Sequence, residues 1–274
     1  MYGAIIGDII GQPYERAAVK SKAFLLFCDT PHFTDDTVMT IAVCDGILKA
    51  GLDARKKEIK SSIIENLRFW AQKYPYAGYG GMFKKWLSMR WPRPYKSFGN
   101  GAAMRVSSVG WLFDSLERTL EVSRWTAEVT HNHKEGIKGA QSIAAAIYLA
   151  RTGSTKKEIK DYIQEKFKYN LSKTCDEIRP SYYFDSSCQG TCPQAITAFL
   201  EGDSFEDVIR NAISLGGDSD TIAAIAGSIA EAFFGIPDYF KEKALEFTKD
   251  DMHEVMGKFE SLARKRVFGV SVMC

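Results

Sequence analysis

The chain has 274 residues, a formal net charge of +2 and 26% charged side chains, a composition that requires neither nucleic acid nor a membrane as a partner. No apolar run approaches the ~20 residues of a membrane-spanning helix, and Asp8 interrupts any signal-peptide core. The scattered cysteines (Cys28, Cys44, Cys175, Cys188, Cys192 and Cys274) are expected to be free thiols, which favours a reducing compartment and hence the cytoplasm.

Helical patterns dominate the first half of the chain. A short apolar helix, interrupted by glycines, is predicted over residues 2–11 and a loop over 12–33. An apolar helix then runs from the acidic stretch 34–37 to a glycine stop at Gly51. Further helices are predicted over residues 55–74, around Trp86 and Leu87, over Met104–Phe113 and over 115–130, with loops at 78–81 and 91–101.

The second half has the same character. Asn132 with Glu135 and Thr155 with Glu158 resemble capping boxes that open two helices. A polar loop is predicted over 170–190, followed by helices over about 193–201, 205–215, 221–234 and 238–267. No alternating run indicates a strand, so the sequence predicts one all-α domain over residues 1–274.

Two acidic stretches share one chemistry. Residues 34–37 (Thr-Asp-Asp-Thr) and 218–221 (Asp-Ser-Asp-Thr) each place two carboxylates and flanking hydroxyls at the head of an apolar helix. A helix start needs only one such cap, so the remaining oxygens are available to another partner. If the two helices are neighbours, four carboxylates meet, and an oxygen-only ligand set suits Mg²⁺, Mn²⁺ or Ca²⁺ better than Zn²⁺. The simpler alternative is two unrelated N-caps on separate surfaces.

Weaker signals lie in the loops. The glycines of 78–81 and 97–101 are suited to presenting backbone N–H groups to phosphate, although ordinary turns explain them equally well. Residues 84–105 are locally basic, an arrangement suited to attracting a diphosphate, but for most of these side chains we favour a solvated face. The pair His131 and His133 lacks an evident third metal ligand.

Taken together, these motifs resemble the ADP-ribosylglycohydrolase family, which includes dinitrogenase reductase-activating glycohydrolase and the ADP-ribosylhydrolases. The resemblance covers the chain to about residue 237 and leaves the remainder without a matching motif. It is carried, in family order, by Gly3-Ala4-x-x-Gly7-Asp8-x-x-Gly11 with Glu15, Thr34-Asp35-Asp36-Thr37, Gly78-Tyr79-Gly80, Phe98-Gly99-Asn100-Gly101-x-Ala103-Met104-Arg105, Thr130-His131 and Gly216-Gly217-Asp218-Ser219-Asp220-Thr221.

The resemblance implies an orthogonally packed multi-helix bundle with a binuclear Mg²⁺ (or Mn²⁺) centre at helix N-termini. The metal ligands that it implies are Thr34, Asp35, Asp36, Asp218, Asp220 and Thr221. The substrate-binding residues that it implies are Gly80, Gly81, Ser97, Phe98, Gly99, Asn100 and His131, with Phe98 stacking on adenine. Ser219 is left over, and we assign it to helix capping.

The implied reaction is metal-dependent hydrolysis of the bond between ADP-ribose and arginine, a serine-type oxygen or a small molecule. A carboxylate from Asp35, Asp36 or Glu15 would accept the proton of the attacking water. Two alternatives remain: a catalytically silent ADP-ribose-binding protein of the same fold, and a two-metal hydrolase of phosphate esters. The expected partner is ADP-ribose on a protein or small molecule, and the expected oligomeric state is a monomer.

Overall fold

A computed structural model describes residues 1–17, 19–28 and 30–268, and within these ranges all regular structure is helical. Only one isolated β-bridge, between Gly99 and Ser187, occurs in the same ranges. The predicted all-α class is therefore confirmed. The elements are α1 (Tyr2–Gly11), the 3-10 turn η1 (Gln12–Tyr14), α2 (Asp35–Ala50), α3 (Lys56–Lys73), α4 (Gly81–Ser88), α5 (Gly101–Met104), α6 (Ser107–Leu112), α7 (Leu116–Glu128), α8 (Lys134–Arg151), α9 (Lys156–Phe167), α10 (Cys175–Ile178), α11 (Cys188–Glu201), α12 (Phe205–Ser214), α13 (Ser219–Phe234), α14 (Asp238–Phe247) and α15 (Asp250–Phe268).

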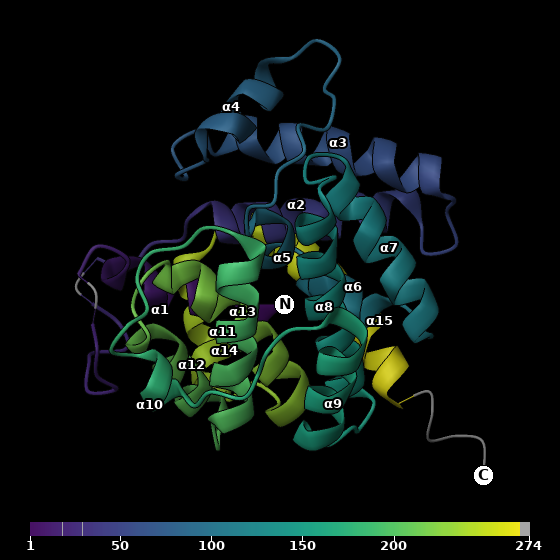
Figure 1. The fold of residues 1–274 in the computed structure, drawn as a ribbon. Coiled ribbons are helices and arrows are strands. Elements are labelled where there is room, and N and C mark those ends of the chain that lie inside the picture. The colour runs from purple at the N-terminus through teal and green to yellow at the C-terminus, as the bar shows by residue number, and fades with distance from the viewer. Residues whose placement is uncertain (18, 29, 269–274) are drawn as a thin grey trace.

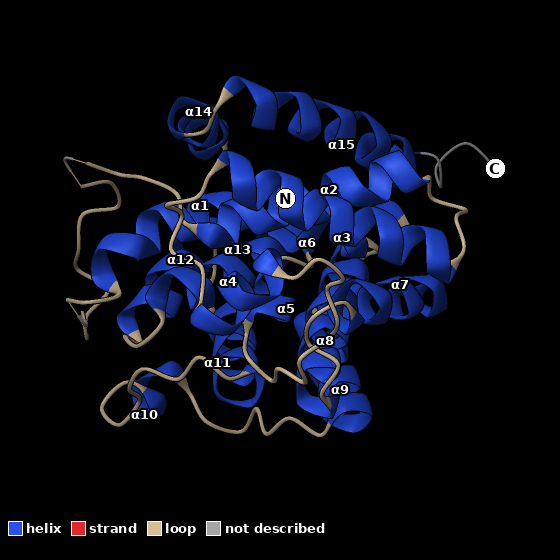
Figure 2. Ribbon diagram, turned by 90° about the horizontal axis from the view of Figure 1, so that it is seen from above, coloured by secondary structure: helices blue, strands red, loops and turns tan. Residues whose placement is uncertain are grey.

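Helix α13 lies at the centre of the molecule, and every residue from Ser219 to Glu231 is buried. It packs against α1, α8, α11 and α12, which surround it in Figures 1 and 2. Helices α2 and α3 run across the molecule in Figure 1, whereas α8 runs nearly at right angles to them, as expected for an orthogonal bundle. The small side chains of α13 explain its position, because alanine and glycine allow several neighbours to approach closely.

The closest approach is made by α1, which crosses α13 through a row of glycines at positions 3, 7 and 11. A Cβ atom on Gly7 would lie 2.2 Å from the carbonyl oxygen of Ala223, and one on Gly11 would lie 2.5 Å from Cα of Asp220. The sequence predicts that these glycines interrupt the helix, but α1 is continuous from Tyr2 to Gly11. They form the face on which the two backbones meet.

Several helix ends agree with the sequence. The hydroxyl of Thr34 caps α2 by accepting a hydrogen bond from the backbone of Asp36 at 3.2 Å. Gly51 ends the same helix with a φ of +89°, a left-handed value that suits glycine. Thr155 and Glu158 form the predicted capping box of α9.

One predicted helix start was wrong. The N-cap of α8 is His133, whose Nδ1 accepts a hydrogen bond from the backbone of Glu135. Asn132 instead accepts a hydrogen bond from the backbone of Lys96 at 2.8 Å. The Asn132 side chain therefore fixes the preceding loop rather than the helix.

Three predicted segments are divided differently in the structure. The single helix expected over Met104–Phe113 is two short helices, because the backbone leaves the α-conformation at Arg105. The single helix expected over 238–267 is broken at Thr248, which is extended. The predicted loop 170–190 contains α10 and the start of α11, because Thr174 and Ser187 each provide an N-cap and Pro193 lies inside α11 rather than at its start.

The remaining expectations concern the whole chain. One cluster of buried hydrophobic side chains runs from Met1 to Ala263, and the single-domain assignment stays a prediction. The cysteines within the described ranges are free thiols, and Cys274 lies outside them. No helix in the described part of the chain has both the length and the apolar character needed to cross a membrane.

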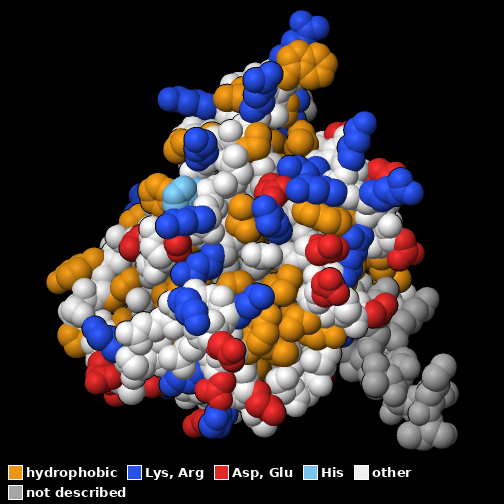
Figure 3. Space-filling view, turned by 45° about the vertical axis from the view of Figure 1, so that its right-hand side comes forward, with side chains coloured by type: hydrophobic (Ala, Val, Ile, Leu, Met, Phe, Trp, Pro, Cys, Tyr) orange, Lys and Arg blue, Asp and Glu red, His pale blue; other side chains and the backbone are white. Residues whose placement is uncertain are grey.

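Residues 75–94, with α4 at their centre, form an arm that projects at the top of Figures 1 and 3. Two tyrosines hold its ends against the body. The hydroxyl of Tyr74 donates a hydrogen bond to Asp251 at 2.6 Å, and the backbone of Tyr95 donates one to Thr130 at 3.1 Å. The buried face of α4 consists of Phe83 and Trp86, whose rings stack with centroids 5.4 Å apart.

The crossing of α1 and α13 generates a stability prediction. Replacing Gly7 with alanine forces the new methyl group into the backbone of α13, so we expect a loss of about 2 kcal/mol or more and a melting temperature lower by about 4–8 °C. The matched control is Gly257→Ala in α15, where a Cβ atom meets nothing within 4 Å and alanine should be neutral or stabilising. Equal melting temperatures for the two variants would contradict the close crossing.

Candidate metal centre and substrate cavity

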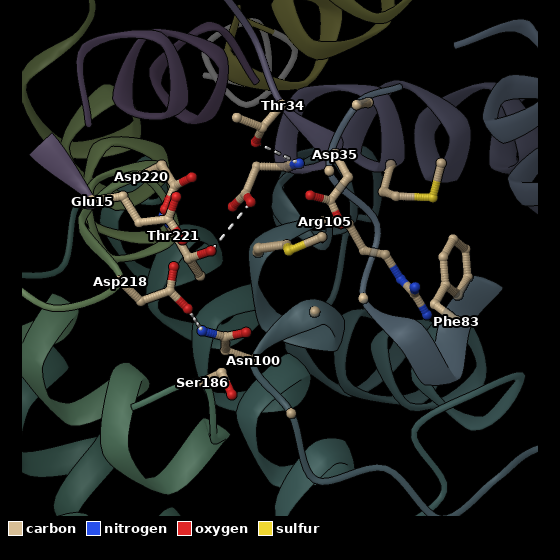
Figure 4. A pocket seen from close by; sticks show the side chains of 18 of the residues that line it. Glu15, Thr34, Asp35, Phe83, Asn100, Arg105, Ser186, Asp218, Asp220 and Thr221 are labelled. Atoms are coloured by element: carbon tan, nitrogen blue, oxygen red, sulfur yellow. Dashed lines mark hydrogen bonds between the residues drawn. The ribbon is translucent and has the colours of Figure 1, made fainter. Parts of the chain in front are cut away.

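The N-termini of α2 and α13 open into one cavity of about 580 Å³. In Figure 4, Glu15, Asp218, Asp220 and Thr221 approach it from one side, and Thr34 and Asp35 approach it from the other. Residues of both predicted acidic stretches therefore line the same space, and the alternative of two separate caps is excluded. A cavity of this size lies within the range of small-molecule sites.

Asp36 joins the two sides. One of its carboxylate oxygens accepts a hydrogen bond from the hydroxyl of Thr221 at 3.1 Å. Its other oxygen, Oδ1, is buried and has no hydrogen-bond partner in the structure. A buried carboxylate oxygen without a donor is costly, so Oδ1 requires a partner that the protein itself does not provide.

The α13 side begins with a tight turn. Gly216 and Gly217 have φ values of +73° and +76°, which other residues adopt only with strain. The turn places Asp218 at the N-cap, where its carboxylate accepts a hydrogen bond from the amide of Asn100 at 2.7 Å. The predicted capping role of Ser219 was wrong, because Ser219 is the first residue inside the helix and its hydroxyl bonds only the carbonyl of Gly217, at 3.4 Å.

Glu15 completes this side of the cavity from the turn after η1. One oxygen atom from each of Glu15, Asp218 and Asp220 lies within 4.8 Å of the other two. Such a group of carboxylates has the spacing of a cation site, since one ion contacts several oxygens at 2.0–2.6 Å, a range typical of Mg²⁺ and Ca²⁺ sites.

Asp8 is a site residue that the sequence reasoning noted only as part of a motif. It is fully buried in α1 and accepts four hydrogen bonds, from the backbone and hydroxyl groups of Thr34 and Thr37, at 2.5–3.0 Å. These bonds hold the first turn of α2 in place. A single carboxylate inside an apolar helix was the signal that could have identified this role.

Burial and mutual repulsion raise the pKa values of the clustered carboxyl groups. Burial raises the pKa of Asp35 to about 7, with a further contribution from the charge of Asp8. Burial and then the charge of Asp220 raise the pKa of Asp36 well above its usual range. The pKa of Glu15 is raised by burial and by the charge of Asp218. Each shift shows that negative charge here lacks compensation.

The donor set fits a hard divalent cation. All candidate ligands are carboxylate or hydroxyl oxygens, from Glu15 and from the acidic stretches 34–37 and 218–221, with no thiolate or imidazole among them. A cation would relieve both the unpartnered oxygen of Asp36 and the repulsion that raises the carboxyl pKa values. Asp8 is the exception, because its four hydrogen bonds already satisfy it.

A second feature of the cavity is a hydrogen-bonded row of three buried residues. Arg105 donates to the hydroxyl of Thr130 at 2.7 Å, and this hydroxyl lies 2.7 Å from Nδ1 of His131. Because arginine can only donate, the hydroxyl accepts from it and directs its own proton to Nδ1. The imidazole therefore carries its proton on Nε2, the nitrogen that faces Gly99 and Gly101.

The charge of His131 follows from the same surroundings. Burial, and secondarily the positive charge of Arg105, lowers the pKa of His131 well below its usual range. The ring is therefore neutral at physiological pH and offers a single N–H donor. Arg105 itself is buried at the cavity wall, and its Nε has no hydrogen-bond partner.

Most of the predicted substrate-binding residues reach the cavity. Phe98 does not line it; its ring is half exposed and lies edge-on to His133 with centroids 5.5 Å apart. The stacking role of Phe98 stays a prediction. The predicted residues that do line the cavity are Gly80, Gly81, Ser97, Gly99, Asn100 and His131.

Comparison with known proteins decides the family. Residues 1–269 match the ADP-ribosylglycohydrolase family. The chain belongs to this family. Enzymes of this family hydrolyse ADP-ribose conjugates, and the protein is accordingly a hydrolase of that class. The resemblance inferred from the ordered motifs is confirmed.

Individual relatives agree with this assignment. ADP-ribosylhydrolase ARH3 of Mus musculus is 27% identical over 91% of this chain and 87% of its own length. ADP-ribosylarginine hydrolase Tri1 of Pseudomonas putida is 26% identical over 86% of this chain and 70% of its own length. A solved structure titled "ADP-ribosylglycohydrolase-related protein complex" superposes with a TM-score of 0.71 at 20% identity, covering 98% of this chain and 95% of that one. This likeness shows that the fold is shared.

The raised pKa of Asp35 generates a prediction about the cation-free protein. Its folded-state value of about 7 exceeds the ordinary 3.8, so the folded state holds the proton more tightly. Its contribution to stability is present below pH 3.8 and is lost as the pH rises to about 7. In EDTA, the unfolding free energy of the wild type should therefore fall as the pH rises from 4 to 7.5. In Asp35→Asn this fall should be less steep, by at most about 1.4 kcal/mol per pH unit. Urea unfolding of this variant and of the exposed control Asp53→Asn measures the effect; identical slopes for both would contradict it.

The row of Arg105, Thr130 and His131 generates another prediction. Thr130→Val keeps the shape but removes the partner of one guanidinium N–H and of one imidazole nitrogen, so we expect a loss of about 1–3 kcal/mol. Nitrogen NMR of the wild-type protein should show His131 as the single Nε2–H tautomer, and the variant should lose this preference. A wild-type ring protonated on Nδ1 is incompatible with the described hydrogen bonds.

Proposed function

We propose that the protein removes ADP-ribose from a target group by hydrolysis of the glycosidic bond, using two divalent cations, Mg²⁺ or Mn²⁺, in the carboxylate cluster. The observation that carries this proposal is the meeting of the two acidic helix starts in one cavity, with a buried oxygen of Asp36 left without a partner. The family supports the reaction class. The oxygen-only donor set supports the metal requirement that the family resemblance implies.

The cation ligands would be supplied by both sides of the cavity. Hydroxyl and carboxylate oxygens are the donors that Mg²⁺ and Mn²⁺ prefer. Glu15 lies close enough to Asp218 and Asp220 to join them. The proposed ligands are Thr34, Asp35 and Asp36 from α2, and Asp218, Asp220 and Thr221 from α13.

The rest of the cavity suits the ADP-ribosyl group. Helix α4 begins at Gly81 without a side-chain cap, and its N-terminus lines the cavity, so its free N–H groups can bind a diphosphate. Ser97, Gly99 and Asn100 line the same wall, where glycine leaves room for a close approach. His131, neutral and protonated on Nε2, would donate a hydrogen bond to a ribose oxygen.

The chemistry follows from the positions of the carboxylates. When bound, the cations would orient the ribose hydroxyls and increase the acidity of a water molecule. A carboxylate of this chain would accept the water proton, and Asp35 is one candidate because it lines the cavity at the start of α2. Glu15 is the alternative base, while Asp36 is more constrained by its bond to Thr221. The cavity walls would hold the sugar so that its C1″ faces the water.

The target group is a separate question. One relative is named for ADP-ribosylarginine and another more generally, and their identities to this chain are 26% and 27%. Because the two identities are nearly equal, they do not favour ADP-ribosylarginine over another ADP-ribose conjugate as the substrate. We propose an ADP-ribosylated protein or small molecule as the partner, and a cytoplasmic monomer, as expected from the sequence.

The proposal predicts the result of one substitution directly. Asp36→Asn keeps the size of the side chain and removes the charge, so we expect hydrolysis to fall by at least about 100-fold and Mn²⁺ affinity to fall with it. Glu254→Gln, an exposed carboxylate on α15, is the matched control and should behave as the wild type.

The assay uses arginine- and serine-linked ADP-ribosyl peptides with and without Mg²⁺, and measures the release of ADP-ribose. Wild-type turnover by Asp36→Asn would contradict the metal centre. ADP-ribose binding without release from either peptide would favour a catalytically silent ADP-ribose-binding protein. Release of phosphate from a phosphate ester would favour a two-metal hydrolase of phosphate esters.

A further inference from the structure

The arm, residues 75–94, has an unusual charge. From residue 66 to residue 113 the chain contains no aspartate or glutamate, although the whole protein has nearly balanced charges. The basic residues of this stretch are Arg68, Lys73, Lys84, Lys85, Arg90, Arg93, Lys96 and Arg105. A net charge of +2 for the whole chain therefore conceals a strongly positive segment beside the cavity.

The positive side chains of the arm are also unpaired. Lys84, Lys85, Arg90 and Arg93 are all exposed, and within the described residues none of them forms an ion pair. On other helices of this protein, exposed lysines commonly pair with acidic neighbours, as Lys157 does with Asp161. In the arm no acid is within reach along the chain, so the charge remains open to a partner.

Large hydrophobic side chains are exposed among these cations. Trp91 is 76% exposed and Tyr76 is 98% exposed, and Met82 and Met89 also face solvent. The guanidinium of Arg90 lies 5.7 Å from the centre of the Trp91 ring. Figure 3 shows blue and orange side chains together on the projecting top of the molecule, with no red among them.

This surface is held in place and reaches the cavity. Helix α4 is anchored by its buried face of Phe83 and Trp86, so its opposite face is presented rigidly. Tyr76 and Met82 belong both to the exposed set and to the cavity lining. A ligand strand bound along the arm would therefore extend directly into the cavity.

We propose that the arm is a docking surface for single-stranded nucleic acid, which would bring an ADP-ribosyl group carried on that chain into the cavity. Cations placed between exposed aromatic rings match the alternation of phosphates and bases in a flexible strand. An acidic polypeptide would use the cations but would leave Trp91 and Tyr76 without a stacking partner. The substrate part of this inference rests on the proposed function, whereas the docking part does not.

The test measures binding of a fluorescent oligothymidylate of about 20 nucleotides to the full-length protein by anisotropy. We expect binding that weakens steeply as salt rises from low values to ~0.15 M. Lys84→Gln/Lys85→Gln and Trp91→Ala should each weaken it about fivefold or more. The matched control is Lys166→Gln/Lys258→Gln, two exposed lysines on α9 and α15, outside the arm, which should leave binding unchanged.

The proposal is overturned if the wild type does not bind at low salt, or if the control pair weakens binding equally. Displacement of the oligonucleotide by polyglutamate at the same charge concentration would also overturn it, in favour of acidic peptides. Release of ADP-ribose from a small conjugate is measured in parallel and should be unchanged in Lys84→Gln/Lys85→Gln. If the wild type releases ADP-ribose from the small conjugate but does not bind the oligonucleotide, the docking surface is contradicted and the proposed hydrolase function is retained. If it binds the oligonucleotide but releases no ADP-ribose, the proposed function is contradicted and the docking surface is retained.

Discussion

The main constraint on the structure is the repulsion among carboxylates that meet, partly or fully buried, at one cavity. Asp35, Asp36, Asp220 and Glu15 approach one another from three segments of the chain, and each has a raised pKa because burial and neighbouring charges oppose ionisation. No protein hydrogen bond reaches the buried oxygen of Asp36. Such an arrangement is unfavourable for a folded protein alone, and a divalent cation is the simplest partner that reverses it.

The helices around the cluster explain why it persists. The glycine face of α1 lets α13 approach closely enough that Asp220 lies against Gly11. The same helix contributes Asp8, whose four hydrogen bonds fix the start of α2. One short helix therefore positions both acidic stretches. The side chains that would touch a cation are held by backbone contacts that cannot easily relax.

Much of this site was predictable from local sequence, and the remainder depended on distant contacts. The acidic stretches 34–37 and 218–221 were evident because their oxygens exceed what a helix cap needs. The roles of Asp8 and of the row through Thr130 were not evident, because they depend on bonds between residues 25 or more positions apart. The two wrong capping predictions, at Asn132 and Ser219, have a similar origin. Each side chain forms its hydrogen bond with a loop or turn residue instead of with the helix N-terminus.

The central claim is that the carboxylate cluster holds divalent cations. Anomalous diffraction from crystals grown with Mn²⁺ tests it most directly, because manganese is located without reference to activity. Two strong peaks are expected in the cavity, between the oxygens of Asp36 on one side and those of Asp218 and Asp220 on the other. A cavity without anomalous density at saturating Mn²⁺, or peaks only on surface carboxylates, would contradict it.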